Sequence, residues 1–272
     1  MNDHQETPSF NDRFPELDIF IHKLIELYQA GNINTWEDLD RHVKEFFDES
    51  KMDYMESMVP GWYKMASYAD GITLVHVMCG FFGMYMLPEF KQLSMHQQGL
   101  MKWVILFHDI DKFHIRGKKD TMHAFNSGVV TANRLPDLGF SYTEAYPELI
   151  RYWSEYTLQA FIQGEAAPTP DNRKLPGILQ GIEQLFGKNM PATLIVKTVL
   201  LHISLHVDDQ YPTPAPLTEQ EAQEYIDGNL FSLLRVMMLS DNEGWSLFDP
   251  ETRSRQRVDT LAAFEKVKQL IS

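Results

Sequence analysis

Apolar residues recur every three or four positions along most of this 272-residue chain, and this spacing restricts the fold more than any other feature. In the segment 14–30 it places Leu17, Ile21, Leu24 and Tyr28 on one helical face, and Gly31 follows as an expected C-cap. Alternating strand patterns with hairpin turns between them are hard to find. The sequence therefore predicts an all-α fold.

Capping signals and apolar runs locate the other helices. Thr35-x-x-Asp38 and Ser94-x-x-Gln97 resemble capping boxes, and the helix that starts at Ser94 is expected to end near His108. The segment 71–87 is apolar nearly all round, so we expect it at the centre of the core. Further helices are predicted over 121–135, 143–163, 175–187, 191–207, 218–240 and 250–271, with surface loops at 164–177 and 211–216.

The length allows one large domain or two small ones, and we expect one compact domain in three parts. Residues 1–66 form a helical extension without chemistry of its own. Residues 67–245 are expected to form the core. Residues 246–272 carry a last helix, which is expected to pack on the core or on another subunit. The sequence is therefore compatible with a homo-oligomer.

Charge and cysteine content limit the partners. The formal net charge is −14, which does not favour nucleic acid as a bulk partner, whereas a phosphorylated small molecule needs only a local basic patch. Cys79 is the only cysteine, so no intramolecular disulfide is possible. The first residues do not resemble a secretory signal, and the apolar stretches 74–87 and 193–207 are too short or too interrupted to cross a bilayer. We therefore expect a soluble cytoplasmic protein without a membrane partner.

The segment Trp103–Lys112 (WVILFHDIDK) is an apolar helix that ends in His108-Asp109. Burying an unpaired carboxylate is costly, so an apolar helix rarely ends this way unless something binds the pair. His76 lies on the core-type helix upstream, and Asp241 follows another apolar run. Imidazole and carboxylate together suit a divalent metal ion.

These elements resemble the HD-domain phosphohydrolase family, whose pattern is His, then His-Asp, then a distant Asp on an all-helical core. The similarity includes the apolar run before His108 and the Ile110-x-Lys112 after Asp109, and it covers roughly residues 67–245. The segment that starts at His123 (HAFNSGVVTA) is similar to a stretch of the HD domains attached to CCA-adding tRNA nucleotidyltransferases. The resemblance implies that the metal ligands are His76, His108, Asp109 and Asp241.

Two residues depart from the family pattern. Asp111 stands where glycine is usual and adds a negative charge beside the metal, where it can bind a substrate hydroxyl or a water or simply cap the helix end. Ser127 stands where many family members have a second histidine. The sequence therefore supports one metal ion better than two.

This ligand set predicts phosphoester hydrolysis. A divalent ion (Mn, Mg, Fe, Ni or Zn) would activate a water and polarise the phosphorus, and Asp109 or Asp241 is a candidate to orient that water. Cationic side chains would meet the phosphoryl oxygens. Lys112 is the best candidate for that role, with Arg116 in the same basic loop and Asp111 as a further catalytic candidate.

Several of these residues also have ordinary structural interpretations. His76 alone could be a buried histidine bonded to a carbonyl, and Asp241 could lie in a plain turn within Ser-Asp-Asn-Glu-Gly. His123 can contact substrate or simply start a helix. His202 and His206 are four residues apart on the predicted helix, which places them on one face, and they can bind substrate, bind metal or be satisfied in the core.

The sequence thus predicts a metal-dependent phosphohydrolase that cleaves a phosphomonoester or phosphodiester of a nucleotide or related small metabolite. An alternative is a regulatory or binding protein that keeps the HD fold and a metal or nucleotide site but has lost hydrolysis, which Asp111 and Ser127 favour. A histidine-rich metal carrier is a third hypothesis, and it requires His202 and His206 to bind the ion.

Overall fold

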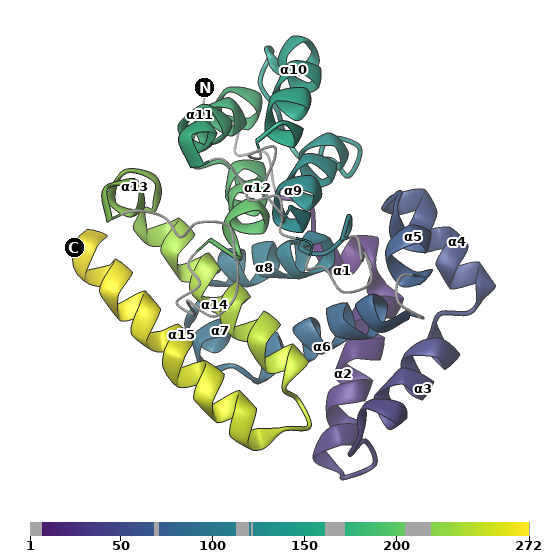
Figure 1. Cartoon of the computed structure of the whole chain (residues 1–272). Helices are drawn as coiled ribbons and strands as arrows, with labels where there is room; N and C mark the ends of the chain where they lie inside the picture. The colour runs from purple at the N-terminus through teal and green to yellow at the C-terminus, as the bar shows by residue number, and fades with distance from the viewer. Residues whose placement is uncertain are drawn as a thin grey trace.

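The computed structural model describes residues 7–67, 71–112, 120, 122–160, 172–204 and 219–271. Within these residues all regular structure is helical, comprising fifteen α-helices and a 3-10 turn at Asn172–Lys174, without a strand (Figure 1). The predicted all-α fold is therefore confirmed.

The N-terminal part of the chain forms a layer of short helices against the core. Phe20 and Phe46 stack at 3.9 Å between ring centroids, and this contact joins the second and third helices. The Thr35 hydroxyl accepts a hydrogen bond from the Asp38 N–H at 3.1 Å, as its capping signal predicted. The helices of this layer are α1 (Phe10–Arg13), α2 (Pro15–Gln29), α3 (Trp36–Phe46), α4 (Glu49–Met58) and α5 (Trp62–Ser67).

Four long helices form the centre of the molecule, and α2, α3 and α5 pack on the first of them. That helix is buried along its whole length from Thr73 to Met84, as its all-apolar sequence predicted. Ser94 and Gln97 form a capping box at the start of the second. The four are α6 (Ile72–Met86), α8 (Met95–Phe107), α12 (Pro191–Leu201) and α14 (Gly228–Trp245).

Glycines allow α6 and α14 to approach closely. A Cβ atom on Gly244 would lie 3.2 Å from the Gly80 nitrogen and 3.3 Å from the Cys79 carbonyl carbon. A Cβ on Gly83 would lie 3.3 Å from the Ser240 carbonyl oxygen. These helices therefore meet almost backbone to backbone, which sets how near their side chains come.

The remaining helices cover this centre. Figure 1 shows α15 alongside α14, with α9 to α12 gathered at the opposite end of the molecule. Arg257 ties α15 to the core, since its guanidinium donates to Glu89 at 2.6 Å and to Glu243 at 2.8 Å. The covering helices are α7 (Pro88–Gln92), α9 (His123–Arg134), α10 (Tyr146–Leu158), α11 (Leu175–Phe186), α13 (Glu219–Tyr225) and α15 (Pro250–Ile271).

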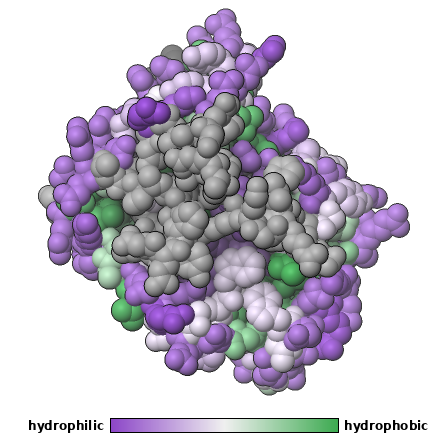
Figure 2. Space-filling model, viewed as in Figure 1, coloured by the Kyte–Doolittle hydropathy of each residue, from purple (hydrophilic) through white to green (hydrophobic). Residues whose placement is uncertain are grey.

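The described surface is mainly hydrophilic on the face shown in Figure 2, with scattered hydrophobic side chains. In the parts of the chain that the structure describes, every helix is too short or too polar to span a membrane.

Two predicted helices differ from the observed ones. The segment 218–240 divides into α13 and α14, because Asp227 has an extended backbone and its carboxylate caps the Leu230 N–H at 2.8 Å, which starts a new helix. The helix predicted over 191–207 ends at Leu201. Most of the predicted loop 164–177 and all of the loop 211–216 lie outside the described residues.

Candidate metal centre

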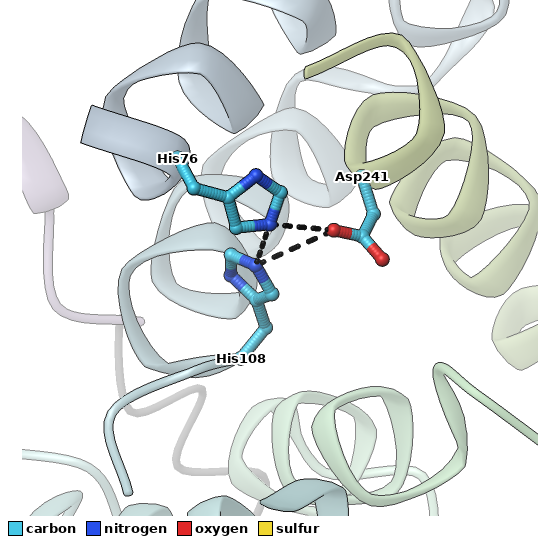
Figure 3. A group of neighbouring side chains, drawn as sticks. All are labelled: His76, His108 and Asp241. Carbon is cyan, nitrogen blue, oxygen red and sulfur yellow. Dashed lines mark hydrogen bonds and ion pairs between the residues drawn. The ribbon is translucent and has the colours of Figure 1, made fainter. Parts of the chain in front are cut away.

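Three core helices bring His76, His108 and Asp241 together (Figure 3). His76 projects from α6, His108 directly follows α8, and Asp241 lies within the last turns of α14. The Nε2 atom of His76 is 2.7 Å from Oδ1 of Asp241 and 3.4 Å from Nε2 of His108. Asp241 is therefore a helical residue, and its interpretation as part of a plain turn is wrong.

Asp109 lies beside this group and is fully buried. Its Oδ2 atom is 3.6 Å from Nε2 of His76 and 3.6 Å from Nε2 of His108. The Lys112 ammonium donates to the same oxygen at 2.6 Å. The four residues that the sequence proposed as metal ligands thus converge on one place.

The other oxygen of Asp109 faces a second group. Nε2 of His123 is 3.5 Å from Oδ1 of Asp109, and the ligand atoms of Asp109, His123 and His202 all lie within 4.8 Å of one another. His123 begins α9 and His202 directly follows α12. From the sequence both histidines were candidates for substrate binding, with a helix start open for His123 and metal or the core open for His202; in the structure they form, with Asp109, a second group able to hold a metal ion.

Three of the histidines are oriented in the same way. In each, the Nδ1 atom lies within hydrogen-bond distance of the carbonyl three residues earlier, so Nδ1–H donates and Nε2 keeps its lone pair. The distances are 2.7 Å for His108 to Ile105, 2.6 Å for His123 to Asp120 and 2.6 Å for His202 to Val199.

His76 is held differently. Among the described residues its Nδ1 has no hydrogen-bond partner. Its ring instead stacks on the Trp245 indole, with 4.1 Å between ring centroids and 18° between planes. Trp245 lies one helical turn beyond Asp241 on α14, so the helix that supplies one candidate ligand also orients another.

Burial and neighbouring charge set the protonation states of the centre. Burial lowers the pKa of His76, lowers that of His123 to about 3 and lowers that of His202 to about 4, so these imidazoles stay neutral at pH 7. Burial alone would raise the pKa of Asp109, but the Lys112 ammonium and the adjacent imidazoles hold it well below its usual value. Neutral imidazoles beside an ionised carboxylate are the forms that bind metal.

Two buried atoms test whether a cation fits the second group. Oδ1 of Asp109 and Nε2 of His202 make no hydrogen bond within the described parts of the chain. An ionised oxygen buried without a partner costs several kcal/mol, roughly. A divalent cation between these atoms would satisfy both, and the nitrogen and oxygen donors suit a borderline divalent metal.

Of the remaining predicted site residues, Asp111 is the one within the described part of the chain, and its partners lie outside these two groups. The Asp111 carboxylate pairs with the Lys64 ammonium at 2.5 Å. The backbone N–H of Asp111 donates to the Ser127 hydroxyl at 3.3 Å. Arg116 and His206 lie outside the described residues, and α12 ends before His206.

The centre is open on one side among the described residues. The side chains of Asp241 and Lys112 are 23% and 22% exposed, whereas those of His76 and His108 are completely buried. Trp245 is 44% exposed and lies against this opening. A substrate would therefore approach past Asp241, Lys112 and Trp245.

The chain has no significant match among protein-family models, curated proteins or solved structures. The chemistry of the site must accordingly be argued from its own side chains. A signal for the second group was present in the sequence, since His202 follows an apolar helix just as His108 does.

Proposed function

We propose that this chain is a metal-dependent phosphohydrolase of the HD-domain type, which cleaves a phosphomonoester or phosphodiester of a small metabolite, and that its centre holds two divalent ions. The observation that carries the proposal is the position of Asp109. One oxygen of its buried carboxylate faces His76 and His108, and the other faces His123. A carboxylate shared in this way suits two adjacent cations.

Each side chain then has a defined task. His76, His108 and Asp241 would hold one ion. His123 and His202 would hold the other, and Asp109 would contact both. A second ion differs from the sequence-based expectation of a single metal. When bound, divalent ions lower the pKa of a coordinated water and polarise a phosphoryl group. Lys112 stands at the open side with its charge beside Asp109, where it can meet a phosphoryl oxygen.

The alternative of a binding protein without activity drew on Asp111 and Ser127. Both residues have partners outside the two groups, since Asp111 pairs with Lys64 and Ser127 accepts from the Asp111 N–H. Although Ser127 replaces a histidine of the family pattern, Asp109, His123 and His202 still give the second group three donors. The geometry therefore favours an active hydrolase over the regulatory alternative.

Metal analysis together with a substrate screen tests the proposal. The apoprotein is loaded separately with Mn²⁺, Mg²⁺, Fe²⁺, Ni²⁺ and Zn²⁺, its bound metal is counted by mass spectrometry, and hydrolysis of phosphoesters is measured. We expect two ions per chain and turnover of at least one phosphoester class. Asp109→Ala should lose both ions, and His202→Ala should lose one.

His22→Ala provides a matched control, because His22 is 53% exposed on α2 and its contacts are with Asp18 and Tyr85. Its metal content and turnover should match those of the wild type. Bound metal without turnover of any phosphoester would favour the regulatory alternative. A chain that binds no divalent ion would exclude the hydrolase and leave only a regulatory protein with a metal-free nucleotide site.

A further inference from the structure

A second pocket shares a wall with the metal centre. It has a volume of about 410 Å³ and lies between α3, the start of α6 and the end of α14. Val75, which lines it, precedes His76 in the chain, and Trp245, which also lines it, stacks on the His76 ring. Whatever occupies this pocket therefore contacts the Trp245 indole, which itself stacks on a candidate metal ligand.

Two indoles form a corner in this pocket. The ring centroids of Trp36 and Trp245 are 6.4 Å apart, and the ring planes are tilted by 44°. Tilted rings offer two faces to a compact, rounded group, whereas a flat base would stack along a single face or between parallel rings. Trp245 already attracts a cation, since the Lys112 ammonium lies 5.6 Å from its ring centroid.

The charges around the corner are negative. Glu37, Asp40 and Lys44 line the pocket, and Lys44 pairs with Asp40 at 2.8 Å, so these three side chains together carry a net charge of about −1. The neighbouring metal centre has the opposite character, because Lys112 and the proposed cations are positive. The combined site therefore suits a molecule with an anionic phosphate at one end and a cation at the other.

We propose that the pocket between Trp36 and Trp245 binds a methylated ammonium group, so that the substrate is a phosphoester of a quaternary ammonium alcohol. The phosphate part of this inference rests on the proposed function. Two properties favour a methylated ammonium over a bare one. It is weakly hydrated, so it loses less hydration free energy on leaving water, and its larger volume fills more of the space beside the indoles.

A pair of isosteric substrates tests the charge directly. Choline phosphate and 3,3-dimethylbutyl phosphate have nearly the same shape, but only the first carries a positive nitrogen. We expect kcat/KM for choline phosphate to exceed that for the neutral ester by about tenfold or more. Glu37→Gln and Trp36→Leu should each reduce this ratio, because each removes a group that favours the positive nitrogen over the neutral carbon.

Binding without turnover separates this inference from the proposed function. Choline alone should quench tryptophan fluorescence, and Glu37→Gln, an exposed change that leaves packing intact, should weaken the binding. Choline binding that responds to Glu37→Gln supports the pocket even if no phosphoester is hydrolysed. Hydrolysis with equal kcat/KM for the two isosteres, or with a preference for nucleoside monophosphates, overturns the pocket and leaves the hydrolase standing.

Discussion

Gly244→Ala should destabilise the protein and weaken its metal centre together, because both depend on how closely α6 and α14 approach. The added Cβ would lie 3.2 to 3.4 Å from Gly80 and Cys79, and the atoms it meets include backbone atoms of α6. Backbone cannot rotate out of the way as a flexible side chain can. The two helices must therefore separate by a few tenths of an ångström, and α14 carries Asp241 with it.

The expected size follows from two opposing terms. Overpacking a tight core contact costs about 1–3 kcal/mol. Replacing glycine by alanine within a helix returns up to about 1 kcal/mol of helix propensity, and less near a helix end such as this one. The free energy of unfolding should therefore fall by about 1–2 kcal/mol. The 2.7 Å approach of His76 to Asp241 should lengthen, and metal affinity should drop by about tenfold.

Urea unfolding followed by circular dichroism measures the first quantity, and competition with a chelator measures the second. Gly99→Ala on α8 is the matched control, since a Cβ there meets nothing within 4 Å. It should raise the free energy of unfolding by about 0.5–1 kcal/mol and leave metal affinity unchanged. If Gly244→Ala proves as stable as Gly99→Ala, the close contact between α6 and α14 does not exist, and the argument from packing to the metal centre fails.

Three further predictions concern the centre and its supports. Trp245→Ala should lower metal affinity by about tenfold in chelator competition, because His76 loses the ring that orients it. Trp245→Phe should restore most of the lost affinity. Equal affinity in the wild type and both variants would refute the stacking role. Lys112→Ala should reduce kcat/KM by about 100-fold without loss of bound metal, and unchanged turnover would contradict its phosphate role. Glu89→Gln tests pH dependence: burial would raise the Glu89 pKa, but the hydrogen bond from Arg257 holds it below 4.5, so its stabilisation is present above that pH and lost as the pH falls. The variant should therefore unfold about 2 kcal/mol more easily in urea at pH 7, and the difference should shrink as the pH falls below 4.5; a difference that does not shrink in acid would refute the ion pair as its cause.

Local signals predicted much of the secondary structure, because capping and periodicity act within one turn of a helix. The Ser94 capping box and the apolar run before His108 gave the bounds of α8 closely. The division between α13 and α14 was missed, since the apolar pattern continues across it. Only the extended backbone at Asp227 shows that its carboxylate starts a new helix, and that conformation depends on tertiary packing.

The same distinction applies to the centre. His76, His108, Asp109 and Asp241 were predicted to meet because their order in the chain resembles a known pattern, and they do lie together. That His123 and His202 face Asp109 could not follow from spacing, because it depends on how α9 and α12 pack against α8. Each histidine by itself had an equally good explanation as a satisfied core residue.

The N-terminal helices were expected to pack on the core without chemistry of their own. In the structure Trp36 lines the pocket beside the metal centre, and Lys64 pairs with Asp111 next to the candidate ligands. A core made of α6, α8, α12 and α14 can position donors for a cation, but by itself it leaves one wall of the neighbouring pocket missing. If the chain is the proposed hydrolase, the core would hold the ions, while Trp36 of the N-terminal layer would help to select the substrate.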